Sequence, residues 1–275
     1  MRELHFEYFM EIKFEESVMN HKFSLKCVPR TNSMQRIEKL HVEVFPADNL
    51  SESADSFGNH ILYGEIEHSH QVFRVSVTGS AVTGLSDGET EDAPWNVGKY
   101  KVQTAYTMPN EELKNYYETC CLDYAGGKKN SPYEKALYMM KKLHQDMQYE
   151  KGVTDIHTTA AEAFALKKGV CQDYAHILVC LCRMDGVPAR YVVGMLEGEG
   201  YSHAWVEIYA EGKWYGLDPT NDMLAEDGHI KISSGRDYND CLLNQGLFTG
   251  GGKQTQTIHV LVSQGKKFER MEKEW

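Results

Sequence analysis

The 275-residue chain lacks a surplus of positive charge and lacks any long apolar run. It carries 29 Lys and Arg residues against 40 Asp and Glu residues, a formal net charge of −11 at pH 7. Proteins that bind a phosphate backbone depend on clustered positive charge, so we expect no nucleic-acid partner. No apolar segment approaches the roughly 18 residues that a membrane-spanning helix needs, so we expect no membrane partner either.

Metal-binding patterns are also missing from the sequence. No two histidines have the His-x-x-x-His spacing that holds zinc on one helix, and no EF-hand calcium loop is present. Cys180 and Cys182 would point about 200° apart on a helix that turns about 100° per residue, and Cys120-Cys121 are simply adjacent. We therefore expect no metal and no other cofactor.

The cysteine count indicates free thiols. Seven is an odd number, so complete pairing within the chain is impossible.

The N-terminus shows no charged stretch followed by an apolar one, the pattern of a signal peptide. We therefore expect a cytoplasmic protein, in which thiols stay reduced and most cysteines pack as small apolar residues.

The first third of the chain alternates in the manner of strands. Apolar side chains take every second position at residues 6–12, 41–45 and 72–77, and clusters of Gly, Asn, Asp and Ser at 48–59 and 84–92 predict turns. This pattern predicts a β-sandwich-like region. A sandwich without chemistry of its own is the simplest interpretation of this part of the sequence.

Helical signals begin near residue 109. Three segments have a capping residue followed by acids or proline in the first turn: 110–112 (NEE), 131–134 (SPYE) and 159–162 (TAAE). Residues 126–130 (GGKKN) favour a linker, and residues 190–218 return to strand character. The length suits one large domain or two small ones. We predict an α+β protein with an N-terminal β-rich domain over 1–107 and a second domain with leading helices over 108–275.

One cysteine lies at the start of a predicted helix. Gly169 stands where a C-cap glycine would end one helix, and Cys171 would begin the next, which runs to about Met184. The N–H groups at a helix start are unpaired and the positive end of the dipole lies there, so a thiolate is stabilised. The acid Asp173 would complement the same helix terminus. A buried structural cysteine is the alternative, because most cysteines are inert.

A nucleophilic cysteine needs an imidazole and a third group that orients the imidazole. Residues 202–209 (SHAWVEIY) alternate as a strand, and residues 214–221 (WYGLDPTN) form the return strand of a hairpin. A turn at Glu211-Gly212 would place His203 and Asp218 as diagonal neighbours on one face. A register slip of one residue would put them on opposite faces.

Each of these residues also has a simpler explanation. His203 could be an ordinary strand histidine, and Asp218 could be a turn-forming residue before proline. The combination of a helix-start cysteine, a strand histidine and a facing aspartate within residues 171–218 nevertheless favours a thiol active site.

These segments resemble the transglutaminase-like superfamily of thiol enzymes. The resemblance lies in residues 169–175 (GVCQDYA), 203–207 (HAWVE) and 218–221 (DPTN). The first third is similar to the N-terminal β region of bacterial cysteine-peptidase-like members of that superfamily, through residues 55–59 (DSFGN) and His68 further on. Residues 235–240 (GRDYND) resemble another motif of those proteins.

The resemblance implies a papain-like core, in which the helix carrying Cys171 packs on an antiparallel sheet carrying His203 and Asp218. Cys171 would be the nucleophile, His203 the general base and acid, and Asp218 the orienting group. Four residues are expected to contact substrate: Tyr201, Trp205, Asp237 and Tyr238. The chain departs from papain-type enzymes at Ala165, where they place a glutamine six residues before the nucleophile, so the second oxyanion donor cannot be assigned.

A site of this kind implies acyl transfer. We expect a cysteine peptidase or amidase that cleaves peptide or isopeptide amide bonds through an acyl-thioester. A transglutaminase shares every step up to the thioester, and hydrolysis is favoured because water is always available. A non-catalytic peptide-binding or assembly module is the third possibility. The expected partner is a peptide or protein substrate, and the oligomeric state stays open.

Overall fold

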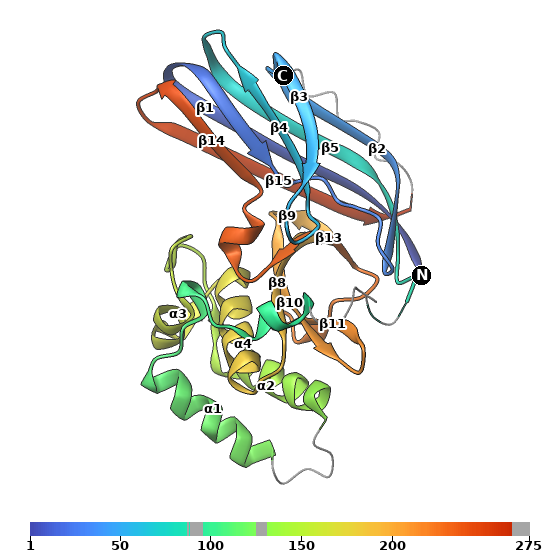
Figure 1. Cartoon of the computed structure of the whole chain (residues 1–275), viewed down its shortest axis with the longest axis vertical. Coiled ribbons are helices and arrows are strands. Elements are labelled where there is room, and N and C mark those ends of the chain that lie inside the picture. Colours follow the sequence, from blue (N-terminus) through green and yellow to red (C-terminus); the bar gives the residue numbers. More distant parts are fainter. Residues whose placement is uncertain (87, 89–95, 125–130, 266–275) are drawn as a thin grey trace.

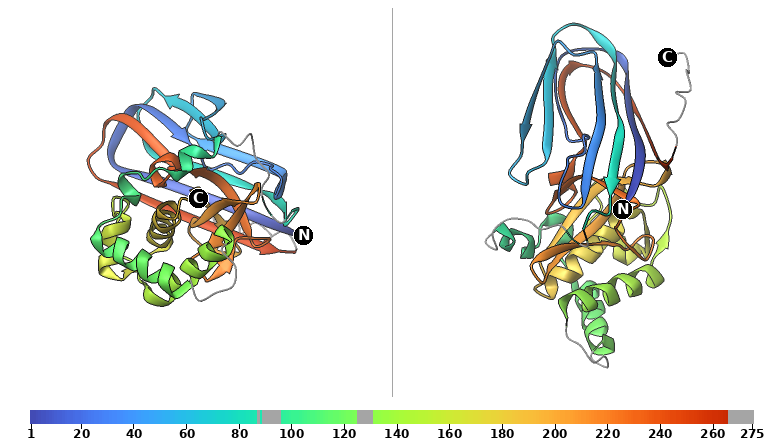
Figure 2. Two further views of the ribbon diagram at one scale, coloured as in Figure 1. Left: turned by 60° about the horizontal axis from the view of Figure 1, so that its bottom comes forward. Right: turned by 90° about the vertical axis from the view of Figure 1, so that its right-hand side faces the viewer.

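The computed structural model describes residues 1–86, 88, 96–124 and 131–265. A large β-sheet region lies above a smaller sheet that is covered by helices in the view of Figure 1. The two parts stack end to end, as the side view in Figure 2 shows. The predicted linker at 126–130 and part of the predicted turn at 84–92 fall outside the described residues.

The large sheet is eight-stranded within the described residues. Its strands are β1 (Arg2–Leu25), β2 (Gln35–Phe45), β3 (Asn49–Ala54), β4 (His60–Ile66), β5 (His70–Thr83), β9 (Gly198–Gly200), β14 (Asn244–Gly250) and β15 (Gln254–Gln264). The first half of β1 lies between β5 and β15, and its second half pairs with β4 and β14. Phe23 in the second half packs on Phe73 of β5, with ring centroids 4.9 Å apart. The two halves therefore face each other like the layers of a sandwich.

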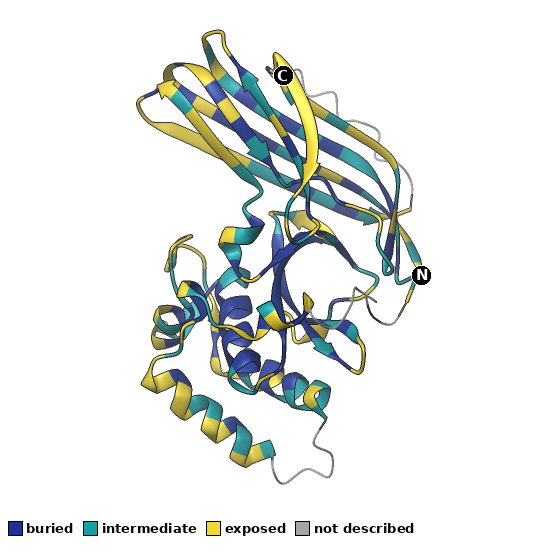
Figure 3. Cartoon of the chain, viewed as in Figure 1, coloured by how far each residue is buried: buried dark blue, intermediate teal, exposed yellow. Residues whose placement is uncertain are grey.

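One predicted turn contains a strand. β3 lies inside the segment 48–59 and pairs with β4. All six β3 residues are exposed, so the strand has no apolar alternation that a sequence pattern could reveal (Figure 3). Its position at the edge of the sheet explains this polarity, since neither face covers a core.

The smaller sheet is antiparallel, in the order β12-β11-β10-β8-β13. Its strands are β8 (Ala189–Leu196), β10 (His203–Ala210), β11 (Lys213–Asp218), β12 (Met223–Leu224) and β13 (His229–Gly235). Around it lie α1 (Glu111–Tyr124), α2 (Pro132–Asp146), α3 (Ala160–Leu166), α4 (Cys171–Met184) and the short parallel pair β6 (Gln148–Tyr149) and β7 (Lys168–Gly169). Short 3₁₀ turns complete the chain: η2 (Gly98–Lys101), η3 (Ala105–Thr107) and η4 (Tyr238–Cys241).

Helix α4 is the centre of this second part. Every residue from Asp173 to Arg183 is buried, which is expected of a helix packed on all sides (Figure 3). It lies against β8 and β10 and is covered by α2 and α3. The buried guanidinium of Arg183 donates hydrogen bonds to the carbonyls of Ala189 and Arg236, so it joins the helix to the start of β8 and to the segment after β13. The predicted end of the helix at Met184 is confirmed.

Helices begin at all three predicted start signals, and two of the three have the predicted cap hydrogen bonds. Asn110 accepts a hydrogen bond from the Leu113 N–H at 2.9 Å, and Thr159 and Glu162 form a complete capping box. The predicted capping box at residue 131 is wrong. The Ser131 side chain makes no cap bond there, and the helix begins with Pro132, whose fixed φ suits the first turn.

Two buried side-chain amides join the two parts of the chain. Gln35 donates to the Lys231 carbonyl and accepts from the Lys231 N–H, both at 2.8 Å. Asn59 makes the same pair of bonds to Ser234, at 2.9 and 2.8 Å. The register of β13 against β8 shifts between Lys231 and Ser233. The amides therefore satisfy backbone groups next to an irregularity in the strand.

The large sheet is completed from the far end of the sequence. β15 pairs with Leu4–Phe14, β14 pairs with the second half of β1, and β9 pairs with β15. The predicted domain limits of 1–107 and 108–275 stay a prediction, and hydrogen-bonded strands of one sheet come from both sides of that limit.

Candidate active site

Helix α4 begins at Cys171 because a side chain closes its first turn. Asp173 Oδ2 accepts a hydrogen bond from the Val170 N–H at 2.7 Å and another from the Thr154 hydroxyl at 2.7 Å. Val170 is extended, so the helix starts at the next residue. Cys171 is only partly buried, and its backbone N–H lies in the first turn, where helices leave N–H groups without intrahelical partners. The predicted role of Asp173 at the helix terminus agrees with this geometry.

Gly169 has a different role from the predicted one. The preceding helix α3 ends at Leu166, and Lys167 takes the left-handed conformation with φ 53°. The prediction that Gly169 caps that helix is therefore wrong. Gly169 belongs to β7, and a Cβ there would lie 2.8 Å from the Cβ and Cγ atoms of Asp173. The glycine leaves room for the carboxylate that closes the first turn of α4.

We expect Gly169→Ala to lower the free energy of unfolding by about 1–3 kcal/mol, because the added methyl group collides with Asp173. The displaced carboxylate would also release the start of α4, where Cys171 lies. Gly98→Ala is the matched control, since nothing lies within 4 Å of a Cβ at that position. Denaturant unfolding curves of both variants measure the difference, and equal stability of the two would contradict this role for Gly169.

The hairpin of β10 and β11 carries the histidine and the aspartate. Val206 pairs with Leu217 and Ala210 pairs with Lys213, so the predicted register is confirmed. His203 Nε2 donates to Asp218 Oδ2 at 2.7 Å. The sulfur of Cys171 lies close enough to the His203 ring to help raise the pKa of the imidazole. Since Nε2 faces Asp218, Nδ1 is the ring nitrogen that is left to exchange a proton with Cys171. The structure thus brings Cys171, His203 and Asp218 together in that order.

The electrostatics of this trio favour a charged imidazole. Burial lowers the pKa of His203, but hydrogen bonds to Asp218 and Cys171 outweigh burial and raise that pKa to about 10. Burial raises the pKa of Asp218, but hydrogen bonds from His203, His229 and Asn221 outweigh it and hold that pKa well below its ordinary range. The carboxylate stays ionised, and the imidazole beside it holds its proton.

A second histidine supports the aspartate, and the sequence did not reveal it. His229 on β13 is buried, and its Nε2 lies 3.2 Å from Asp218 Oδ2. Trp205 packs edge-on against His229, with ring centroids 5.1 Å apart, and lies 6.3 Å from the ring of His203. Gly194 makes space for Trp205, because a Cβ there would lie 2.8 Å from Cζ3 of the indole. These contacts fix both partners of the carboxylate.

The nitrogens and oxygens of His203, Asp218 and His229 lie within 4.8 Å of one another, so among the described residues this trio could approach a metal ion. A tetrahedral zinc with bonds of about 2.0–2.1 Å separates its ligands by about 3.3 Å. The 2.7 Å separation of His203 Nε2 and Asp218 Oδ2 is that of a hydrogen bond instead. The geometry fits an oriented imidazole better than a metal centre, and the expected absence of a metal stays a prediction.

The four predicted substrate residues lie in different surroundings. Tyr201 is 64% exposed, two residues before His203, and the ammonium of Lys151 lies 4.9 Å above its ring. Trp205 is buried beneath His203. Asp237 is buried and caps η4 by accepting from the Asn239 N–H. The Tyr238 N–H donates to His176 on α4. Their contact with substrate stays a prediction, and Tyr201 is the one that is well exposed.

The remaining cysteines differ from Cys171 in their environment. All seven cysteines are free thiols. The odd count in the sequence had excluded only complete pairing within the chain. Burial raises the pKa of Cys27 and of Cys180 to about 12. Cys171 is partly exposed, begins a helix and contacts an imidazole, so it is the thiol placed for chemistry.

The fold and the site together define a transglutaminase-like core. The description of the transglutaminase-like superfamily matches residues 122–219, and that of the bacterial transglutaminase-like N-terminal region matches residues 4–82. The chain therefore contains a transglutaminase-like core and a bacterial transglutaminase-like N-terminal region, and the resemblance predicted from the motifs is confirmed.

Known proteins resemble the chain over most of its length. An uncharacterized protein of Mycobacterium leprae is 26% identical over 258 residues, which cover 86% of this chain and 90% of the relative. An uncharacterized protein of Mycobacterium tuberculosis is 27% identical over 245 residues, covering 77% and 76%. A crystal structure from Cytophaga hutchinsonii, described as a candidate cysteine protease, superposes with a TM-score of 0.76 at 20% identity and covers 97% of this chain and 91% of that one. This likeness shows the shared fold, and the predicted α+β, papain-like class is confirmed.

None of the described helices is long and apolar enough to cross a bilayer.

Proposed function

We propose that this protein is a cysteine hydrolase that cleaves a peptide or isopeptide amide bond through a thioester on Cys171. The observation that carries the proposal is the position of the His203 ring between Cys171 and the buried Asp218. A thiolate beside an imidazolium is the activated form of a cysteine nucleophile. The superfamily and the fold are in keeping with an enzyme, and the reaction itself is our inference.

The cycle begins when the Cys171 sulfur attacks the amide carbonyl. The carbon–sulfur bond forms, and the carbonyl oxygen becomes an oxyanion that the backbone N–H of Cys171 can stabilise. The imidazolium of His203 then gives its proton to the departing nitrogen as the carbon–nitrogen bond breaks, which leaves a thioester and a neutral amine. Water next attacks the thioester carbonyl while the imidazole of His203 takes a proton from it. The carbon–sulfur bond then breaks, which releases the acid and restores the thiolate. Asp218 keeps the ring oriented throughout.

Water is the acceptor that best suits this site. Cys171 is partly exposed, so solvent reaches the thioester. Transfer to an amine would require a pocket that holds the amine and excludes water. A protein-glutamine transglutaminase remains the alternative outcome of the test, since its first half-reaction is the same.

A released-amine assay on the full chain tests the proposal. A library of peptides and isopeptides is incubated with and without a primary-amine acceptor, and products are identified by mass spectrometry. Hydrolysis predicts the free acid in both conditions. Addition of water raises the summed mass of the products by 18 Da, whereas transfer adds the mass of the amine acceptor. Products that contain the amine would replace hydrolase by transglutaminase. A chain that forms no product and no thioester would leave the binding module as the explanation.

The pH dependence of stability follows from His203. Its pKa is about 10 in the folded protein against an ordinary value of 6.5, so the folded state binds the proton more tightly. The stabilisation is fully present below pH 6.5 and is lost as pH rises from 6.5 to about 10. We therefore expect the free energy of unfolding to fall more steeply across this window in the parent protein than in His203→Gln.

Denaturant unfolding at pH 6.5, 8 and 10 measures this difference. Amide cleavage should also decline above about pH 10, because proton delivery to the leaving nitrogen needs the imidazolium. Parallel stability profiles for the two proteins would show that the His203 proton is not held by Asp218 and Cys171.

A further inference from the structure

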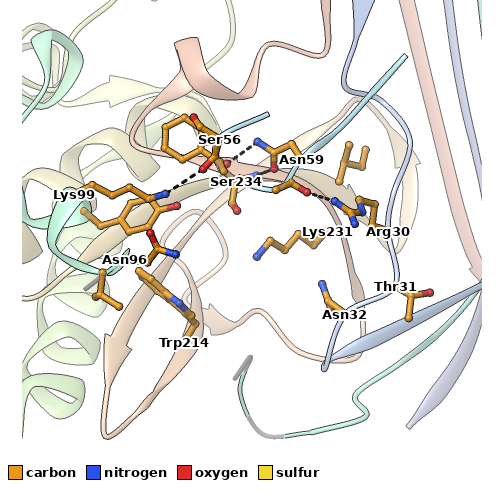
Figure 4. A pocket seen from close by; sticks show the side chains of 15 residues that line it. Arg30, Thr31, Asn32, Ser56, Asn59, Asn96, Lys99, Trp214, Lys231 and Ser234 are labelled. Carbon is orange, nitrogen blue, oxygen red and sulfur yellow. Dashed lines mark hydrogen bonds between the residues drawn. The ribbon is translucent and has the colours of Figure 1, made fainter. Parts of the chain in front are cut away.

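A polar cavity lies at the junction of the two parts of the chain (Figure 4). Its volume is about 270 Å³, room for about nine water molecules at about 30 Å³ each. Fifteen described residues line it, from the segment 30–32, the segment 56–59, the region of η2 and strands β11 and β13. The described lining holds Arg30, Lys99 and Lys231 but no acidic residue, in a chain whose net charge is −11.

Two of the cations reach neutral partners from the N-terminal part of the chain. Arg30 donates to the backbone carbonyl of Gly58, and Lys99 donates to the carbonyl of Ser56 at 3.4 Å (Figure 4). The ammonium of Lys99 also lies 4.7 Å from the ring of Phe57. Carbonyl oxygens and rings carry no full negative charge, so neither cation is paired with a carboxylate among the described residues. Lys231 on β13 also lines the cavity, and its ammonium contacts Glu207.

A buried donor also lines the cavity. Trp214 on β11 is 1% exposed, and its Nε1–H has no hydrogen-bond acceptor among the described residues. An unpaired buried donor is costly, so it favours a ligand that can accept a hydrogen bond. The rings of Phe57, Tyr100 and Trp214 supply flat apolar walls beside the charges.

We propose that this cavity binds a small organic anion that has one carboxylate or phosphate group and a flat apolar portion. Its acceptor oxygens would take hydrogen bonds from Arg30, Lys99 and the Trp214 indole, and its flat part would lie against the aromatic rings. The cavity shares β11 with Asp218 and β13 with His229, so its occupant contacts both strands that hold the catalytic carboxylate. The site is separate from the Cys171 chemistry and does not depend on it.

Calorimetric titration of the full chain tests the site with phenyl phosphate and phenylacetate, which distinguish the two anionic groups. We expect at least one of them to bind, and we expect the uncharged benzyl alcohol and the cationic benzylamine to bind at least tenfold more weakly. Cys171→Ala should bind the anion as the parent does, which keeps this result apart from the proposed hydrolysis. Failure of both anions to bind would overturn the proposal.

Variants then locate the binding. The double variant Arg30→Gln with Lys99→Gln should weaken the anion about tenfold or more, and Trp214→Phe, which removes the N–H but keeps a ring, should weaken it several-fold. Lys101→Gln is the control, because Lys101 belongs to the same turn η2 but does not line this cavity. Unfolding curves confirm that each variant is folded. Equal affinity in the double variant and in Lys101→Gln would place the anion elsewhere and overturn the proposal.

Discussion

Cys171→Ala is expected to reduce amide cleavage by about 10⁴-fold or more while the protein stays folded. The substitution removes the sulfur that forms the thioester, and no other described thiol lies beside an imidazole that is paired with a carboxylate. Cys171 is only partly buried at a helix start, so alanine is accommodated with little loss of packing. Initial rates on the best substrate of the amide library, together with unfolding curves, measure both effects.

Cys121→Ala is the matched control for this prediction, because Cys121 is also a partly buried free thiol on a helix. It should keep parental activity. Alkylation by iodoacetamide gives an independent readout, since a partly exposed thiol beside the imidazole of His203 should react faster than the other six cysteines. A Cys171→Ala protein with parental turnover would remove this residue from the mechanism, and uniform alkylation of all seven thiols would favour a binding module.

Asp218→Asn is expected to lower kcat by about 10²–10⁴-fold, with little change in KM. Asp218 Oδ2 accepts from His203, from His229 and from the amide of Asn221, at 2.7, 3.2 and 2.8 Å. If the side-chain oxygen of an asparagine at this position accepts from the Thr220 N–H, its NH₂ group faces the three donors that Oδ2 now accepts from. Donors that face donors leave these buried groups without hydrogen bonds. The ring of His203 would lose both its orientation and the charge that keeps it protonated.

Asp222→Asn is the control for this second prediction. Asp222 lies four residues further on, is exposed and has φ 50°, a conformation that asparagine tolerates. The readout is the pH profile of kcat/KM as well as its height. In Asp218→Asn the decline at high pH should move to lower pH, because the imidazolium has lost its buried counter-charge. An unchanged profile would mean that Asp218 acts on stability alone.

Local signals in the sequence predicted the central part of the site. The start of α4, the turn at Glu211-Gly212 and the register of β10 against β11 depend on residues close together in the chain. These features place Cys171 near a helix start and His203 on the same face as Asp218. Family motifs strengthened the prediction because they lie in the same segments.

The remaining parts of the site depend on distant pairings. His229 reaches Asp218 only because β8 lies between β10 and β13 in the sheet. No sequence pattern around residue 229 predicts this strand order. The role of Gly169 was predicted wrongly for a similar reason. A glycine near a helix end is typical of a C-cap, and the sequence does not indicate that the carboxylate of Asp173 lies beside this glycine. The anchors Gln35 and Asn59 are two polar side chains whose partners lie 196 and 175 residues away.

The pairing of β15 has a mechanical consequence for the chemistry. Along one edge β15 is held by eleven paired residues of β1, and along the other it holds Gly198–Gly200, the short strand that ends three residues before His203. The backbone that leads into the imidazole is therefore anchored in the larger sheet. Fraying of that sheet would loosen His203 without touching Cys171, so we expect proteolytic nicking within residues 254–264 to lower the proposed hydrolytic activity.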